Sequence, residues 1–283
     1  MSAPRIPPLL EPYLAPLPRG ALVLLTSVLG ARANWLVVRF IYAVLRQRVD
    51  DEGQSLRNDG HDGGTPGVVL LSFMRDEAFW LDAASKMGLD LHHLARRGAF
   101  VFVPGLTGLF APTAPPGSDA LGSLGAAVNV ALAQLSASQP ILIIDQPDVL
   151  LAARGNAMTA RRLHDSLLTL RQRVHAALIV LSADHPLIHS RATSLERHHA
   201  ALALSLAHAA HTVMALRPLD TGAAPDVSGV LRLSTRLDHL DYAYDGQLQH
   251  HGPHKSLQQT LPSAEFLYHV AGDATVRVFE RGA

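Results

Sequence analysis

One carboxylate at the end of an apolar run has the best position for chemistry. Residues 141–144 read Ile-Leu-Ile-Ile, and Asp145 follows them. Such a run between Pro140 and Pro147 predicts a strand that is buried on both faces of a parallel sheet. Ligands of these sheets bind outside the carboxyl ends of the strands, so Asp145 could contribute to a metal or nucleotide site. The alternative, which the motif by itself favours, is that Asp145 caps the turn that follows.

A nucleotide site would also need a phosphate-binding loop. In P-loop NTPases an acid at the position of Asp145 helps to hold Mg²⁺, and the loop reads G-x-x-x-x-G-K-[ST]. Here Ser27 and Arg32 stand at the glycine positions, Ala33 at the lysine position and Asn34 at the Ser/Thr position. Without the glycines the backbone cannot wrap a triphosphate.

The sequence therefore predicts a degenerate nucleotide site at Arg32 and Asp145, with no cofactor and no ATP hydrolysis by this chain alone. The alternative is an active P-loop-type NTPase with an unusual phosphate loop, in which Arg32 offers the charge.

The sequence contains no motif that supports another kind of catalytic site or a metal site. The chain has no cysteine and no net charge, and its 16 histidines form no H-E-x-x-H motif. The pairs His185/His189 and His208/His211 have helical spacing, which compositional bias explains better than a metal site does. A nucleophile elbow G-x-S-x-G is absent. We expect no catalytic residues and no metal.

The hydrophobic pattern predicts alternating strands and helices followed by a strand-rich end. The expected strands are 21–26, 67–72, 99–103, 141–145 and 177–182, and the expected helices are 31–48, 76–87, 120–135, 159–174 and 200–210. Segments 150–158 and 185–199 are expected to be loops, as are 49–64 and 104–119. Four alternating segments at the end of the chain, 212–216, 229–234, 265–270 and 275–279, predict antiparallel strands. The fold class is therefore α/β, a doubly wound, mostly parallel sheet with an antiparallel C-terminal extension.

Two domains are expected: a proline-rich N-terminal arm, 1–19, and one α/β domain, 20–283. The arm carries leucines that would be exposed in a monomer, which favours a subunit contact over an arm folded back on its own domain. Residues 21–45 form the longest apolar stretch, but Arg32 and Arg39 interrupt it. A strand plus a helix is therefore a better interpretation than a membrane segment.

Five segments together resemble a known family. They occur in the same order and at similar spacing, and they are Gly20-Ala-Leu-Val-Leu-Leu, Phe100-Val-Phe-Val-Pro-Gly105-Leu, Ile141-Leu-Ile-Ile-Asp145-Gln-Pro-Asp148-Val-Leu-Leu, Leu178-Ile-Val-Leu-Ser-Ala-Asp184-His, and Phe266-Leu-Tyr-His with Val276-Arg-Val-Phe. From about Gly20 to its end, the chain resembles the sixth-subunit family of Elongator, the tRNA-modifying complex. The fourth and fifth Elongator subunits share that family's fold.

The resemblance implies a RecA-like domain without a P-loop and without catalytic activity. Such a subunit forms a heterohexameric ring with the fourth and fifth Elongator subunits. The ring docks on the catalytic Elongator subcomplex, binds tRNA and supports modification of the wobble uridine. The implied location is the cytoplasm, with the nucleus as a second compartment and no membrane contact.

The same resemblance places two loops at the pore of the ring. These loops are 150–158, which contains Arg154, and 185–199, which contains Arg191 and Arg197. The planar guanidinium fork suits phosphate, so these three arginines are the RNA-binding candidates. The alternative for each of them is an ordinary solvated loop charge.

Overall fold

The fold is described from a computed structural model that covers residues 5–14, 16–50, 64–107, 119–222, 224–235 and 262–281. Most of the predicted loops 49–64 and 104–119 lie outside these residues. Within the described part of the chain, no helix combines the length and the apolar character needed to cross a bilayer.

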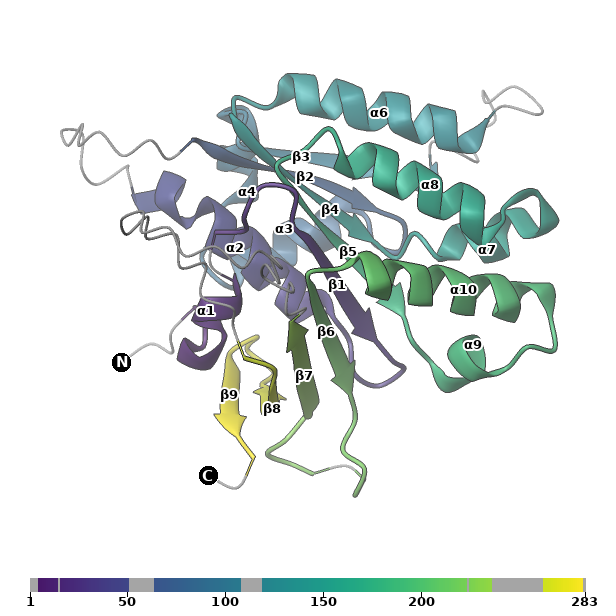
Figure 1. Cartoon of the computed structure of the whole chain (residues 1–283). Helices are drawn as coiled ribbons and strands as arrows, with labels where there is room; N and C mark the ends of the chain where they lie inside the picture. The colour runs from purple at the N-terminus through teal and green to yellow at the C-terminus, as the bar shows by residue number, and fades with distance from the viewer. Residues whose placement is uncertain are drawn as a thin grey trace, which may run out of the picture.

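A single mixed sheet forms the centre of the molecule (Figure 1). Its strand order is β3-β2-β4-β5-β1-β6-β7-β8-β9. The strands are β1 (Leu22–Ser27), β2 (Pro66–Ser72), β3 (Phe100–Pro104), β4 (Gln139–Asp145), β5 (Ala176–Ser182), β6 (Thr212–Arg217), β7 (Gly229–Thr235), β8 (Ala264–Val270) and β9 (Val276–Glu280). Strands β1 to β6 pair in parallel, whereas β7, β8 and β9 add antiparallel pairs. The predicted fold class is confirmed, including the antiparallel extension.

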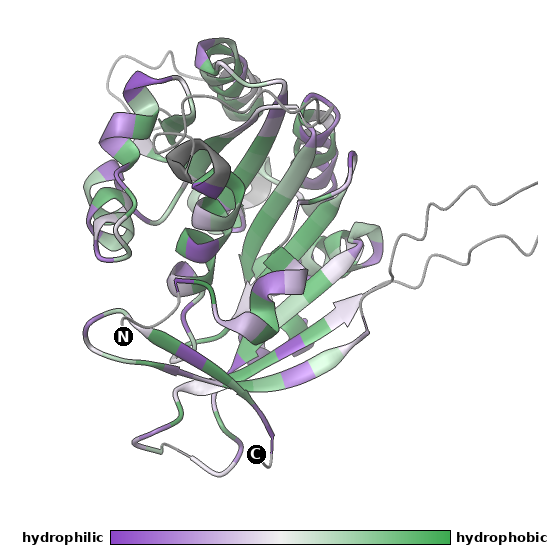
Figure 2. Ribbon diagram, turned by 90° about the vertical axis from the view of Figure 1, so that its left-hand side faces the viewer, coloured by the Kyte–Doolittle hydropathy of each residue, from purple (hydrophilic) through white to green (hydrophobic). Residues whose placement is uncertain are grey.

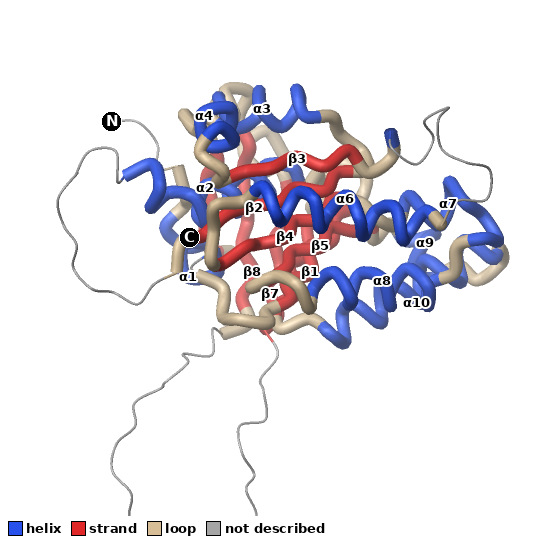
Figure 3. Tube along the Cα trace, turned by 90° about the horizontal axis from the view of Figure 1, so that it is seen from above, coloured by secondary structure: helices blue, strands red, loops and turns tan. Residues whose placement is uncertain are grey.

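Helices cover both faces of the parallel part of the sheet. One face packs against α2 (Asn34–Asp50), α3 (Glu77–Ser85) and α4 (Leu91–Arg96). The other packs against α6 (Ala120–Gln134), α7 (Val149–Arg154), α8 (Ala160–Arg171) and α10 (Ser194–Ala209). Figure 3 shows α6, α8 and α10 side by side across the sheet. The strands between the layers are almost uniformly apolar (Figure 2), as expected for strands buried on both faces.

Two segments that the sequence predicts as loops are helical. Residues 150–158 contain most of α7 and a 3-10 turn at Gly155–Ala157, and 185–199 contain α9 (His185–His189) and the start of α10. In α7, Leu150 and Leu151 are buried, so tertiary packing stabilises a helix of only six residues. Helix α10 begins at a capping box, in which Thr193 and Glu196 each bond the other's backbone N–H.

The N-terminal arm packs on its own domain, so the prediction that its leucines would be exposed in a monomer is wrong. A 3-10 turn at Pro8–Leu10 and the helix α1 (Glu11–Leu14) bury Leu10, Tyr13 and Leu14 in the core that α2 shares. The Tyr13 hydroxyl donates to the carbonyl of Pro262 at 2.9 Å. The predicted subunit contact through these side chains is replaced by a contact with the chain's own C-terminal strands.

Candidate functional site

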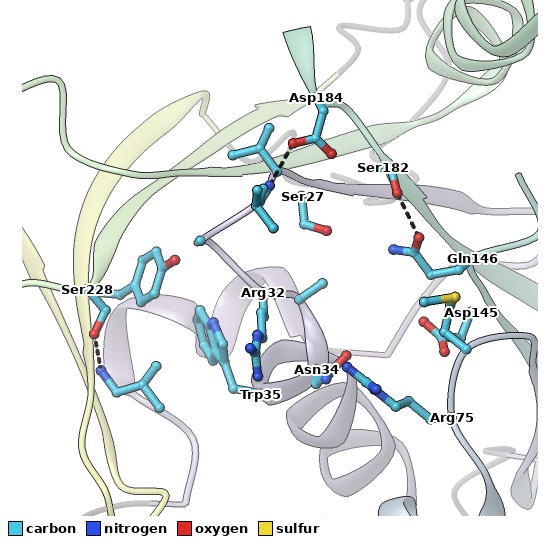
Figure 4. A pocket seen from close by; sticks show the side chains of 17 residues that line it. Ser27, Arg32, Asn34, Trp35, Arg75, Asp145, Gln146, Ser182, Asp184 and Ser228 are labelled. Carbon is cyan, nitrogen blue, oxygen red and sulfur yellow. Dashed lines mark hydrogen bonds between the residues drawn. The ribbon is translucent and has the colours of Figure 1, made fainter. Parts of the chain in front are cut away.

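A cavity of about 850 Å³ opens at the carboxyl ends of β1, β4 and β5 (Figure 4). Its size falls in the ordinary range for small-molecule sites, about 300–1,000 Å³. The loop from β1 to α2 forms one side, and the end of β8 forms another. Its principal polar lining residues are Arg32, Asn34, Arg75, Asp145, Ser182 and Asp184. The structure therefore brings the two predicted site residues, Arg32 and Asp145, to one cavity.

Asp145 lies at the floor of this cavity and is 2% exposed. Its Oδ2 is 2.9 Å from the hydroxyl of Ser72, at the end of the neighbouring strand β2. Its side-chain bond therefore goes across the sheet, and the prediction that it caps the following turn is wrong. Burial raises the pKa of the Asp145 carboxyl from 3.8 to about 6, while the Ser72 hydrogen bond and the charge of Arg75 oppose this rise.

Ser72 links Asp145 to the start of the next loop. Its hydroxyl also lies 2.8 Å from the carbonyl of Arg75 and accepts from the Arg75 N–H at 3.2 Å. A hydroxyl has one proton, so it donates to Asp145 or to the Arg75 carbonyl at any moment. When Asp145 is protonated it can itself donate to Ser72, which satisfies all three groups. Burial therefore disfavours the ionised form that a magnesium ligand must take, although the Ser72 bond favours ionisation.

Gln146 gives the backbone after Asp145 an unusual conformation. Its φ is 57°, in the left-handed region that a side chain disfavours. Its N–H donates to the Val180 carbonyl at 3.1 Å, and its side-chain oxygen accepts from the Ser182 hydroxyl at 2.8 Å. Both partners belong to β5, so the neighbouring strand holds Gln146 in place.

The loop between β1 and α2 is a closed turn. Val28 and Ala31 form an antiparallel bridge, with the Ala31 N–H donating to the Val28 carbonyl at 2.9 Å. Gly30, at the corner, has a φ of 91°. The Leu29 N–H donates to Oδ1 of Asp184 at 2.7 Å (Figure 4). A phosphate oxygen at Leu29 would therefore have to displace a carboxylate of the chain itself.

Two arginines and two acids share the cavity. Arg32 is exposed on the loop before α2, and Arg75 is half-buried with its guanidinium 5.0 Å from the centre of the Phe79 ring. Figure 4 shows the Arg75 side chain extending towards Asn34, at the start of α2. Together with Asp145 and Asp184, these groups give the cavity a mixed charge that favours no multiply charged anion strongly.

Aromatic side chains close the cavity beside the antiparallel strands. The rings of Trp35 and Tyr268 have centroids 5.0 Å apart and are tilted by 34°. Burial raises the pKa of Tyr268 to about 12, so its hydroxyl stays protonated at physiological pH. The antiparallel C-terminal strands therefore form part of the cavity lining, through Tyr268 of β8.

A second acid that follows β4 is paired with a histidine of α10. Asp148 is 6% exposed and His199 is 3% exposed, and His199 Nε2 lies 3.1 Å from Asp148 Oδ2. The Ser182 N–H donates to the same oxygen at 3.3 Å. Asp148 Oδ1 and His199 Nδ1 are buried, and neither has a hydrogen-bond partner within the described part of the molecule. This pair ties the end of β4 to α10.

The predicted RNA-binding arginines lie outside this cavity. Arg191 is exposed in the link between α9 and α10, and Arg197 lies in the first turn of α10. Arg197 Nη1 donates to the carbonyls of Arg191 and Ala192 at 3.0 and 3.4 Å, which brings the two arginines together. Arg154 ends α7, a separate element, and is half-buried.

Arg75, Asp184 and the Asp148–His199 pair are not predicted as site residues from the sequence. Arg75 and Asp184 follow the apolar strands β2 and β5 by three and two residues, the same signal that singles out Asp145. That signal could have identified both. The partner of Asp148 is 51 residues away and could not be inferred from spacing. Within the residues described, no group of three His, Asp or Glu side chains is arranged to hold a metal ion.

Comparisons with known proteins find a likeness in structure only. The sequence matches no protein family and no curated protein. Among solved structures, the chain is similar to a KaiC-like protein of the hyperthermophilic archaeon Pyrococcus horikoshii OT3. The two share 13% sequence identity with a TM-score of 0.58, over 98% of each chain. At this identity the likeness shows the fold alone: the chain has a RecA-like α/β fold.

Proposed function

We propose that this chain is a non-catalytic subunit of a RecA-like ring of the Elongator type. In this role it pairs with the fourth and fifth Elongator subunits in a heterohexamer that docks on the catalytic subcomplex. The ring binds tRNA and supports modification of the wobble uridine. Two lines of support meet here: the RecA-like fold and the ordered set of sequence segments that resemble the sixth-subunit family.

The observation that carries the non-catalytic part is the bond from the Leu29 N–H to Asp184. Phosphate loops work because several backbone N–H groups point at an anion that the protein does not supply. Here one such donor already binds a carboxylate and another, at Ala31, bonds within the turn. The raised pKa of Asp145 acts in the same direction, because burial already disfavours the ionised form that would bind magnesium.

Co-purification tests the ring assignment. A tagged copy of the chain is produced together with the fourth and fifth Elongator subunits of its own organism. We expect a stoichiometric complex with two copies of each chain, measured by light scattering and native mass spectrometry. A tagged version of an unrelated RecA-fold protein is the control. If the chain remains a monomer and neither subunit co-purifies with it, the assignment is wrong.

An active NTPase is the second candidate, and the cavity favours it. The space beside Arg32 and Arg75 is large enough for a nucleotide. A ligand at a hundred times its Kd stabilises a protein by about 2.7 kcal/mol. Because of the closed turn we expect no rise in melting temperature with millimolar Mg-ATP. A clear rise, lost in Arg32→Ala but kept in the exposed control Arg96→Ala, would establish this second candidate instead.

A further inference from the structure

Two histidines of α9 form an exposed pair next to the arginines. His185 and His189 lie one helical turn apart, and their rings stack with centroids 4.5 Å apart and planes 30° apart. Both side chains are exposed. Helix α9 packs against α10, and Arg191 follows His189 by two residues. Arg197 folds back onto the carbonyls of Arg191 and Ala192, so four basic side chains gather around one short segment.

Two acidic groups lie near this segment, and both accept backbone hydrogen bonds. Asp184, just before α9, bonds the Leu29 N–H, and Glu196 of α10 bonds the Thr193 N–H at 2.8 Å. The bond to the Thr193 backbone is the largest cause that lowers the Glu196 pKa, so Glu196 stays ionised as part of the helix cap. The other histidines of this part of α10 are His198, which is half-buried, and His199, which binds Asp148.

We propose that His185, His189, Arg191 and Arg197 form a phosphate-binding surface for RNA whose affinity depends on protonation of the stacked histidine pair. This inference rests on the proposed function, since it names how the subunit would hold its RNA. Two imidazolium ions in a stack repel each other. A phosphate group bound beside them offsets that repulsion, so binding takes up a proton.

An RNA phosphodiester is a suitable probe because it keeps one negative charge throughout the range in which histidine titrates. Any dependence on pH between 5.8 and 7.8 then comes from the protein. Uptake of about half a proton on average across these two pH units corresponds to an affinity gain of about tenfold as the pH falls. The two arginines stay charged, so their contribution is independent of pH but sensitive to salt.

Fluorescence anisotropy with a labelled uridine oligonucleotide tests the proposal. The full-length chain, with whichever subunits co-purify with it, is titrated at pH 5.8, 6.8 and 7.8 at constant ionic strength. We expect a gain of about tenfold at low pH for the unaltered protein. The double variant His185→Gln/His189→Gln should lose this gain and match the unaltered protein at pH 7.8. His189→Arg should bind at pH 7.8 as tightly as the unaltered protein binds at pH 5.8.

Matched controls are available on α4, which lies at the opposite end of the molecule from α9 in Figures 1 and 3. His92 and Arg96 are exposed there, and His92→Gln and Arg96→Gln should leave the pH profile and the salt slope unchanged. The double variant Arg191→Gln/Arg197→Gln should weaken binding at every pH and flatten the salt slope by about 2.

The outcomes separate the two proposals. If RNA binds but the pH profile is flat, or survives in His185→Gln/His189→Gln, the histidine inference is overturned and the RNA-binding subunit stands. If no RNA binds at any pH, both are overturned. Tighter binding of an acidic peptide than of RNA would overturn the assignment of the surface to RNA.

Discussion

Replacing His199 with leucine is expected to lower the free energy of unfolding by about 3 to 5 kcal/mol, because it leaves the buried carboxylate of Asp148 without its side-chain partner. Leucine fills most of the volume of the imidazole, so the loss comes mainly from Asp148 rather than from a cavity. Asp148 is 6% exposed and would keep only the Ser182 N–H, at 3.3 Å. Urea unfolding followed by tryptophan fluorescence, from Trp35 and the fully buried Trp80, gives the measurement.

A second variant identifies the cause. In Asp148→Asn/His199→Leu no carboxylate stays buried, and the asparagine oxygen can still accept from Ser182. We expect this double variant to recover most of the lost stability, which is the sign of strong coupling between the two sites. His92→Leu, on the exposed face of α4, is the control and should change stability by less than about 0.5 kcal/mol. A loss below about 1 kcal/mol in His199→Leu would show that the pair contributes little.

Replacing Asp145 with asparagine is expected to stabilise the protein at neutral and alkaline pH. The folded state holds the pKa of Asp145 at about 6, against 3.8 for the free side chain. Between these values the folded chain binds more protons than the unfolded chain, so stability falls as pH rises. Above about pH 6 the ionised side chain then costs ~3 kcal/mol of stability. Asparagine keeps an acceptor for Ser72 and removes the charge.

The size of this gain should depend on pH. The advantage of Asp145→Asn should approach ~3 kcal/mol at pH 8, about half of that at pH 5, and about a fifth of it at pH 4. Urea unfolding at these pH values measures it, with Asp165→Asn as an exposed control. A variant that is less stable at pH 8 than the unaltered protein would contradict the explanation. If Mg²⁺ stabilised the unaltered protein but not Asp145→Asn, Asp145 would be a metal ligand after all.

The sequence predicts the fold well because the strands depend on local composition. Four consecutive aliphatic residues specify β4 without reference to any neighbouring strand. Similar aliphatic runs specify β1, β2 and β5. Helices α7 and α9 are not predicted from the sequence, because they have only six and five residues, which is too few to show a periodic hydrophobic pattern. The start of α10 could have been found, because Thr193 and Glu196 have the spacing of a capping box.

The site is predicted only in part because its chemistry depends on strand order. Asp145 and Arg32 follow from motif positions, and both line the cavity. The effect of Ser72 on Asp145 requires β2 to lie beside β4, a register that pairs these two residues directly. The position of Asp184 beside Leu29 likewise requires β5 next to β1. No local pattern in the sequence gives these neighbours.

The bond between the Leu29 N–H and Asp184 makes the turn between β1 and α2 independent of the nucleotide concentration in the cell. A tethered group has an effective concentration that is fixed by the chain and not by the surroundings, often in the millimolar range even for flexible links. Asp184 is held by β5, so it stays at the Leu29 N–H whether free nucleotide is scarce or abundant. The turn between β1 and α2 would therefore keep one conformation as the energy supply changes.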